Sequence, residues 1–173
     1  MSHETYLTPA FYPNLLIDVS KLIAKKISDD KVKLKINSIA VTGVSGLVVG
    51  GVVSTITRLP LIVVRKSPSH SPRRIEYADN IGRELRYCFI DDFISTGATL
   101  VRIAKTIYLE RDSGATPKLI KAYLYNENGQ DYVFTKTLDD MVAVDDFKEM
   151  NVPVTRFYFI HLDAYKKGVN SYA

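Results

Sequence analysis

Short apolar runs alternate with helix-like segments between residues 38 and 126, and this alternation is the strongest constraint on the fold. Each run has the length of a buried strand. The segment 98–112 places apolar residues three and four positions apart, on one helix face, and 46–59 is rich in small residues that suit close packing. Such alternation predicts an α/β protein with a central, mostly parallel sheet flanked by helices. The predicted strands are 38–42, 60–66, 86–92 and 118–126, and the predicted helices are 46–59 and 98–112.

The segments around this core are less regular. Residues 14–29 have apolar residues on one helical face and lysines opposite, which predicts an amphipathic helix. The stretch 67–84 is rich in proline, serine and charge, which predicts a long mobile loop with a short hairpin around RRIEY (73–77). Residues 135–151 are interpreted as an acidic helix or loop, and 154–162 as a last strand. Because no interdomain linker is evident, residues 1–173 are expected to form a single domain.

Composition limits the classes of function. The chain is 46% hydrophobic and 24% charged, which is ordinary for a soluble protein. Its longest apolar run, residues 46–53, is too short to cross a bilayer, so no membrane is expected. The net charge of +4 fits a solvated surface or an anionic small ligand, and no dense run of basic residues suggests nucleic acid. Cys88 is the single cysteine and reads as a core residue in a reducing, cytoplasmic location.

One strand-to-helix turn carries an unusual set of polar residues. In open parallel sheets, ligands bind beyond the carboxyl ends of the strands. The stretch FIDDFISTGATL (89–100) places Asp91 and Asp92 at such an end, just before a small-residue loop that opens a helix. The backbone N–H groups of such a loop favour an anion, and carboxylates accept hydrogen bonds from hydroxyls or hold Mg²⁺. A sugar phosphate would satisfy both halves, although either half alone fits an ordinary helix-capping turn.

The run Phe89–Thr99 closely resembles the phosphoribosyl pyrophosphate (PRPP) signature of type I phosphoribosyltransferases, and a weaker resemblance extends over about residues 36–126. The resemblance implies that Asp91 and Asp92 bind the ribose hydroxyls, take part in catalysis and hold Mg²⁺, largely through water and the ligand. It also implies that a five-residue loop cradles the 5′-phosphate of PRPP. That loop consists of Ser95, Thr96, Gly97, Ala98 and Thr99.

The resemblance assigns roles to two further turns. The turn after the first strand falls where the family has its pyrophosphate loop, here Val44, Ser45 and Gly46, with Ser45 where many members have lysine or arginine. Arg65 and Lys66 match an Arg-Lys pair of adenine and orotate members, which implies pyrophosphate binding by both residues and a catalytic role for Lys66.

The loop 67–84 corresponds to the family's flexible catalytic lid. Its basic residues His70, Arg73 and Arg74 are candidates for closing over pyrophosphate. Glu76 lies in an Ile-Glu-Tyr run that resembles a catalytic Leu-Glu-Tyr of adenine-type lids, although a plain surface glutamate explains it equally well. The small hood that contacts the base would come from about residues 1–35 and 126–173.

The resemblance therefore implies Mg²⁺-dependent transfer of the 5-phosphoribosyl group from PRPP to a nucleobase, with release of pyrophosphate, in nucleotide salvage. Hypoxanthine/guanine members have an aspartate at the position of Ser95. This difference disfavours that subclass. The Ile-Glu-Tyr run at 75–77, and the Ser45-Gly46 pair, which resembles some xanthine-type members, favour an adenine-like or xanthine-like purine, with orotate next. The family also implies a homodimer. Two alternatives stay open: a non-catalytic regulator of the same fold that senses PRPP or a nucleotide, and an α/β domain that binds no PRPP.

Overall fold

The computed structural model describes residues 11–66, 74–77, 84–110, 117–126, 130–137 and 149–157. In this part of the chain, a seven-stranded sheet has the order β3-β2-β1-β4-β5-β7-β6. The five inner strands are parallel, and the edge strands β3 and β6 are antiparallel to their neighbours, which confirms the expected mostly parallel sheet. The strands are β1 (Ser38–Thr42), β2 (Leu61–Val64), β3 (Ile75–Tyr77), β4 (Arg86–Asp91), β5 (Lys118–Leu124), β6 (Tyr132–Thr137) and β7 (Glu149–Arg156).

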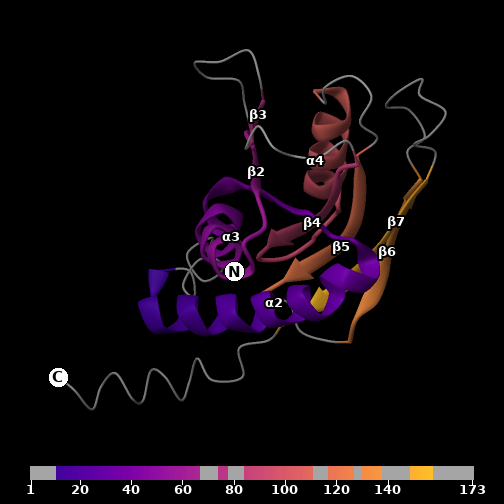
Figure 1. The fold of residues 1–173 in the computed structure, drawn as a ribbon. Coiled ribbons are helices and arrows are strands. Elements are labelled where there is room, and N and C mark those ends of the chain that lie inside the picture. Colours follow the sequence, from indigo (N-terminus) through magenta and orange to yellow (C-terminus); the bar gives the residue numbers. More distant parts are fainter. Residues whose placement is uncertain are drawn as a thin grey trace.

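Helices cover both faces of the sheet (Figure 1). The helices α2 (Pro13–Leu34) and α3 (Gly43–Thr57) pack on one face, and α4 (Ala98–Leu109) packs on the other. Strand β1 is buried along its whole length because helices cover both of its faces. The small residues of α3 allow a close approach to the sheet, since a Cβ on Gly50 would lie 2.4 Å from Cγ1 of Val41. None of the described helices is long and apolar enough to span a membrane.

The main difference from the sequence-based expectation lies at the β6 edge of the sheet. Residues 132–137 form a strand, although 135–151 was interpreted as an acidic helix or loop. The strand alternates in burial, with Tyr132 and Phe134 against the core and Val133 exposed. Strand β7 spans 149–156 rather than beginning at 154, and residues 158–162 lie outside the described part.

The ends of the other helices and strands differ less from the predicted ones. Helix α3 begins at residue 43 rather than 46, and α2 continues to residue 34 rather than 29. Around RRIEY, residues 75–77 form the strand β3, which pairs antiparallel with β2, a strand that lies before the predicted loop. The rest of the predicted lid, residues 67–73 and 78–83, lies outside the described residues.

A polar cluster joins α2 to the sheet. The Nζ of Lys121 and the hydroxyl of Tyr123, both on β5, donate hydrogen bonds to Oδ2 of Asp30 at 2.8 Å and 2.9 Å. Lys26 adds a longer contact to Oδ1 of Asp30, at 3.4 Å. Burial by itself would raise the pKa of Asp30, but these hydrogen bonds and positive charges hold it below its ordinary value. The charge of Asp30 is therefore well compensated in the folded protein.

Candidate active site

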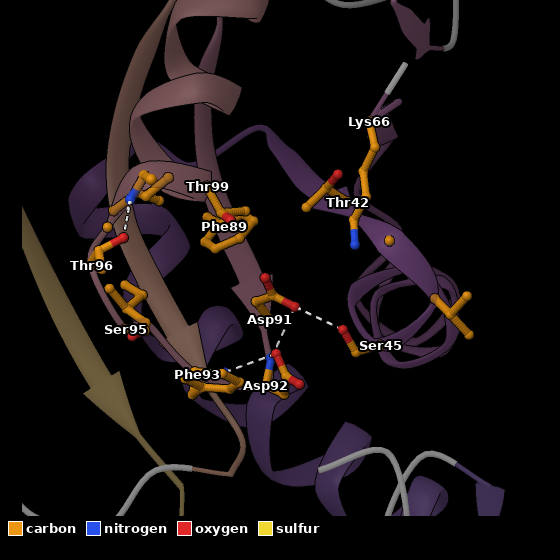
Figure 2. A pocket seen from close by; sticks show the side chains of 16 residues that line it. Thr42, Ser45, Lys66, Phe89, Asp91, Asp92, Phe93, Ser95, Thr96 and Thr99 are labelled. Carbon is orange, nitrogen blue, oxygen red and sulfur yellow. Dashed lines mark hydrogen bonds between the residues drawn. The ribbon is translucent and has the colours of Figure 1, made fainter. Parts of the chain in front are cut away.

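A pocket of about 350 Å³ lies beyond the carboxyl ends of the central strands. It is lined by the turn 42–45, by Lys66, by Phe89 and by residues 91–100. Figure 2 shows Thr42, Lys66 and Ser45 on one side, Thr96 and Thr99 on the other, and the two aspartates between them. Three separate turns that the sequence analysis singled out thus meet in one cavity. Their meeting follows from strand order, because β2, β1 and β4 are neighbours and parallel.

Asp91 lies at the centre of the pocket, and only 7% of its surface is exposed to solvent. Its Oδ1 accepts hydrogen bonds from the hydroxyl of Ser45 and from the backbone N–H of Asp92, both at 3.0 Å (Figure 2). Burial, followed by the negative charge of Asp92, raises the pKa of the Asp91 carboxyl to about 7. The carboxyl group of Asp91 therefore holds its proton more tightly than an exposed aspartate does.

Asp92 is held in the pocket by its backbone. Its Oδ1 accepts a hydrogen bond from the backbone N–H of Phe93 at 3.0 Å, and its carbonyl accepts one from the N–H of Asn126 at 2.9 Å. The carbonyl of Asp91 similarly accepts a hydrogen bond from the N–H of Tyr125 at 3.2 Å. These bonds continue the β4–β5 pairing past the end of β4, so the two carboxylates are carried by ordered backbone rather than by a free loop.

The turn before α4 forms one end of the pocket. Gly97 has a φ of 72°, in the left-handed region that glycine adopts most readily. Glycine offers no capping side chain, and within the turn the N–H of Ala98 donates to Oγ1 of Thr96 at 3.3 Å. The start of a helix that lines a pocket is well suited to bind an anion.

The opposite end of the pocket is the start of α3. Gly43 has a φ of 65°, and a Cβ there would lie 3.3 Å from Cε of Lys66, whose side chain lies over this turn. A Cβ on Gly46 would lie 2.9 Å from the carbonyl oxygen of Ile90, so glycine allows α3 to approach the end of β4. That approach brings Ser45 within reach of the carboxylate of Asp91. Val44 is exposed beside them and also lines the pocket.

Other predicted site residues lie away from this cavity. Arg65 and Glu76 form an ion pair with each other across the β2–β3 edge, and neither lines the pocket. Arg74 is exposed, and its backbone N–H donates to Oε2 of Glu110 at 2.6 Å. His70 and Arg73 lie outside the described residues. Of these neighbouring residues, Lys66 lines the pocket, whereas Arg65 and Glu76 do not.

The structure also shows a residue that the sequence analysis missed. Arg102 on α4 donates hydrogen bonds to the carbonyl oxygen of Arg65 at 3.2 Å and to Oγ1 of Thr42 at 3.4 Å. The hydroxyl of Thr42 in turn donates to the carbonyl oxygen of Val64 at 2.7 Å. Arg102 thus joins α4 to the ends of β1 and β2. No local pattern marks it, because its partners are 37 and 60 residues away in the sequence.

The fold defines the class: an α/β protein with a mostly parallel sheet and a polar pocket at the carboxyl ends of its strands. No family model matches the sequence. Over 145 residues the chain is 30% identical to a hypoxanthine/guanine phosphoribosyltransferase of Methanocella arvoryzae, covering 77% of this chain and 69% of the relative. A relative of the same name from Methanococcus maripaludis is 30% identical over 141 residues, covering 75% of this chain and 72% of the relative.

Among solved structures, an orotate phosphoribosyltransferase of Francisella tularensis matches with a TM-score of 0.52 at 16% identity, over 70% of this chain. The match spans about half of that protein, 54%, and shows the shared fold. Together with the relatives' sequence identity, it establishes that the chain belongs to the type I phosphoribosyltransferase family.

Proposed function

We propose that the protein transfers the 5-phosphoribosyl group from PRPP to a purine base and releases pyrophosphate. The observation that carries the proposal is the arrangement of one pocket. A carboxylate pair, with Asp91 buried and Asp92 half-buried, lies between the start of α4 and a lysine beside the start of α3. This order of groups matches a sugar phosphate with a second anionic group at the other end.

Each group then has one task. The turn 95–99 binds the 5′-phosphate, Asp91 and Asp92 accept hydrogen bonds from the ribose hydroxyls, and Lys66 with the turn 44–46 binds pyrophosphate. The bond from the anomeric carbon to pyrophosphate oxygen breaks as the bond to a purine nitrogen forms. Negative charge grows on the leaving group, where Lys66 stabilises it. Holding the donor at both ends also orients its anomeric carbon for the incoming base.

The carboxylate pair fits Mg²⁺. Two hard oxygen donors side by side, one of them with a raised pKa, favour a small divalent cation. Asp91 and Asp92 would hold it, largely through water and ligand oxygens. When bound, Mg²⁺ neutralises charge on the pyrophosphate group.

Binding of Mg²⁺ and PRPP is expected to weaken as the pH falls below about 7, because Asp91 must release its proton to meet the cation. Calorimetry at pH 6 and pH 8, in buffers of different ionisation enthalpy, measures the protons released. More protons should be released at pH 6 than at pH 8. PRPP itself also titrates, so the matched control is Asp91→Asn, in which the Asp91 contribution disappears. Equal proton release by wild type and Asp91→Asn would contradict the proposed role of this carboxyl.

The names of the relatives support a purine over orotate. Within the purines, two signals point in different directions. The relatives are named for hypoxanthine and guanine, whereas Ser95 and the Ser45-Gly46 and Ile75-Glu76-Tyr77 runs led us to expect adenine or xanthine. The proposal therefore names a purine as the class of acceptor. A homodimer, a cytoplasmic location and a place in purine salvage belong to the same proposal, and light scattering measures the oligomeric state.

A panel of bases tests the proposal. The protein is incubated with PRPP, Mg²⁺ and, separately, hypoxanthine, guanine, xanthine, adenine and orotate, and pyrophosphate release is measured. We expect release with at least one purine and none with orotate, and turnover of orotate alone would refute the purine assignment. If PRPP raises the melting temperature but no base gives release, the sensing regulator is favoured. If PRPP neither binds nor reacts, the domain does not use PRPP.

A further inference from the structure

The turn 95–97 has a second set of contacts, on the side away from the pocket. They come from the edge strand β6, no residue of which lines the pocket. A Cβ built on Gly97 would lie 2.0 Å from Cζ and 2.4 Å from Cε2 of Phe134, so the ring edge packs directly against the glycine. Two residues further along β6, Nζ of Lys136 donates a hydrogen bond to the carbonyl oxygen of Thr96 at 3.3 Å.

The hydrogen bond from Lys136 has a directional consequence. The carbonyl of Thr96 and the N–H of Gly97 belong to one planar trans peptide unit, in which they point in opposite directions. By holding the carbonyl of Thr96 on the β6 side, Lys136 directs the N–H of Gly97 away from β6. The orientation of one donor of the proposed phosphate site is thereby set from outside the pocket.

The ring of Phe134 restricts the same peptide unit by packing. Gly97 is buried although it belongs to a turn, and its backbone is in the left-handed region. Phe134 packs against the core cluster of the α4 face, so its ring cannot move away freely. The turn is thus held by packing from a neighbouring strand as well as by its own hydrogen bonds.

Strand β6 is itself well supported. It pairs with β7 from Tyr132 to Thr137, with Phe134 opposite Val152. The hydroxyl of Thr135 adds a hydrogen bond to Oδ1 of Asn151 at 2.8 Å. Strand β7 in turn pairs with β5, so the support for the turn is continuous with the sheet.

We propose that Phe134 and Lys136 are positioning residues that hold the turn 95–97 in the conformation that receives the 5′-phosphate of PRPP. The proposal rests on the proposed function, since it concerns the same site. It assigns to the edge of the sheet a role in donor affinity, and none in the choice of base.

The test compares Phe134→Ala and Lys136→Met with two matched controls. Val133→Ala changes the neighbouring, exposed residue of β6, and Lys118→Met removes one exposed positive charge at the amino end of β5. Ribose 5-phosphate is the binding probe. In each test variant its Kd should rise about tenfold, and KM for PRPP should rise alike, while kcat and KM for the base stay near wild type. Lys136→Arg, which keeps a donor, should restore most of the affinity.

A second measurement does not depend on activity. Amide hydrogen exchange at residues 96–99, followed by NMR, should be faster in the test variants and unchanged in the controls. If Phe134→Ala does not fold, Phe134→Leu replaces it, since leucine keeps most of the apolar volume but loses the ring edge. Wild-type exchange and ribose 5-phosphate binding in the test variants would overturn the inference. A wild-type protein that does not use PRPP refutes the proposed function instead, and the exchange data still decide whether β6 holds the turn.

Discussion

Asp91→Asn combined with Asp92→Asn is expected to abolish turnover of PRPP, with a loss of at least about a thousandfold in kcat/KM. The double substitution removes both negative charges from the centre of the pocket while keeping the size of each side chain. Ribose hydroxyls and Mg²⁺ then meet amides instead of carboxylates, and the amides neither neutralise the cation nor accept hydrogen bonds as strongly. Pyrophosphate release with the purine that the wild type prefers measures the effect. Full activity of the double variant would refute the assignment of the site.

The same experiment separates lost chemistry from lost structure. Because burial raises the pKa of Asp91 from an ordinary 3.8 to about 7, the ligand-free folded protein holds this proton more tightly than the unfolded chain. Over that pH range the contribution of Asp91 to stability therefore falls as the pH rises, and at pH 8 the ionised carboxyl destabilises the fold. The double variant has no such charge at position 91. At pH 8 its melting temperature should equal or exceed that of the wild type, whereas a marked drop would mean that the inactive variant is misfolded.

Asp30→Ala is expected to lower the free energy of unfolding by about 3 kcal/mol, and the melting temperature by roughly 10 °C. The side chains of Lys121 and Asp30 are only 12% and 16% exposed. Removal of the carboxylate leaves the ammonium of Lys121 and the hydroxyl of Tyr123 without their shared acceptor, beneath the helix that covers this face of the sheet. Urea denaturation followed by circular dichroism measures the loss.

The neighbouring residue provides the matched control. Asp29 is exposed on the same helix, so Asp29→Ala should change stability by no more than about 0.5 kcal/mol. Replacing both partners, Asp30→Leu with Lys121→Met, should recover much of the loss, because no buried charge then remains unpaired. Equal stability of Asp30→Ala and Asp29→Ala would show that the cluster contributes nothing to the attachment of α2.

Much of the fold was predictable because its signals are local. Four of the inner strands are short apolar runs, α2 and α4 repeat apolar residues at helical spacing, and α3 is rich in small residues, so each segment shows its type without its neighbours. Strand β6 was missed for the opposite reason. Its run YVFTKT ends in polar residues and becomes a strand through pairing with β7 and packing of Phe134 on the core.

In the candidate site, too, the local features were predictable from the sequence and the long-range contacts were not. The sequence by itself determined the carboxylate pair and the small-residue turn, because a strand end and the helix start that follows it occupy one continuous stretch, residues 89–100. Only the tertiary structure decided which distant side chains contact that stretch. The hydroxyl of Ser45 reaches Asp91 from 46 residues away, and Lys136 reaches the carbonyl of Thr96 from outside the pocket, 40 residues away. The physical reason is strand order: sheet pairing brings together segments whose separation along the chain leaves no local pattern to read.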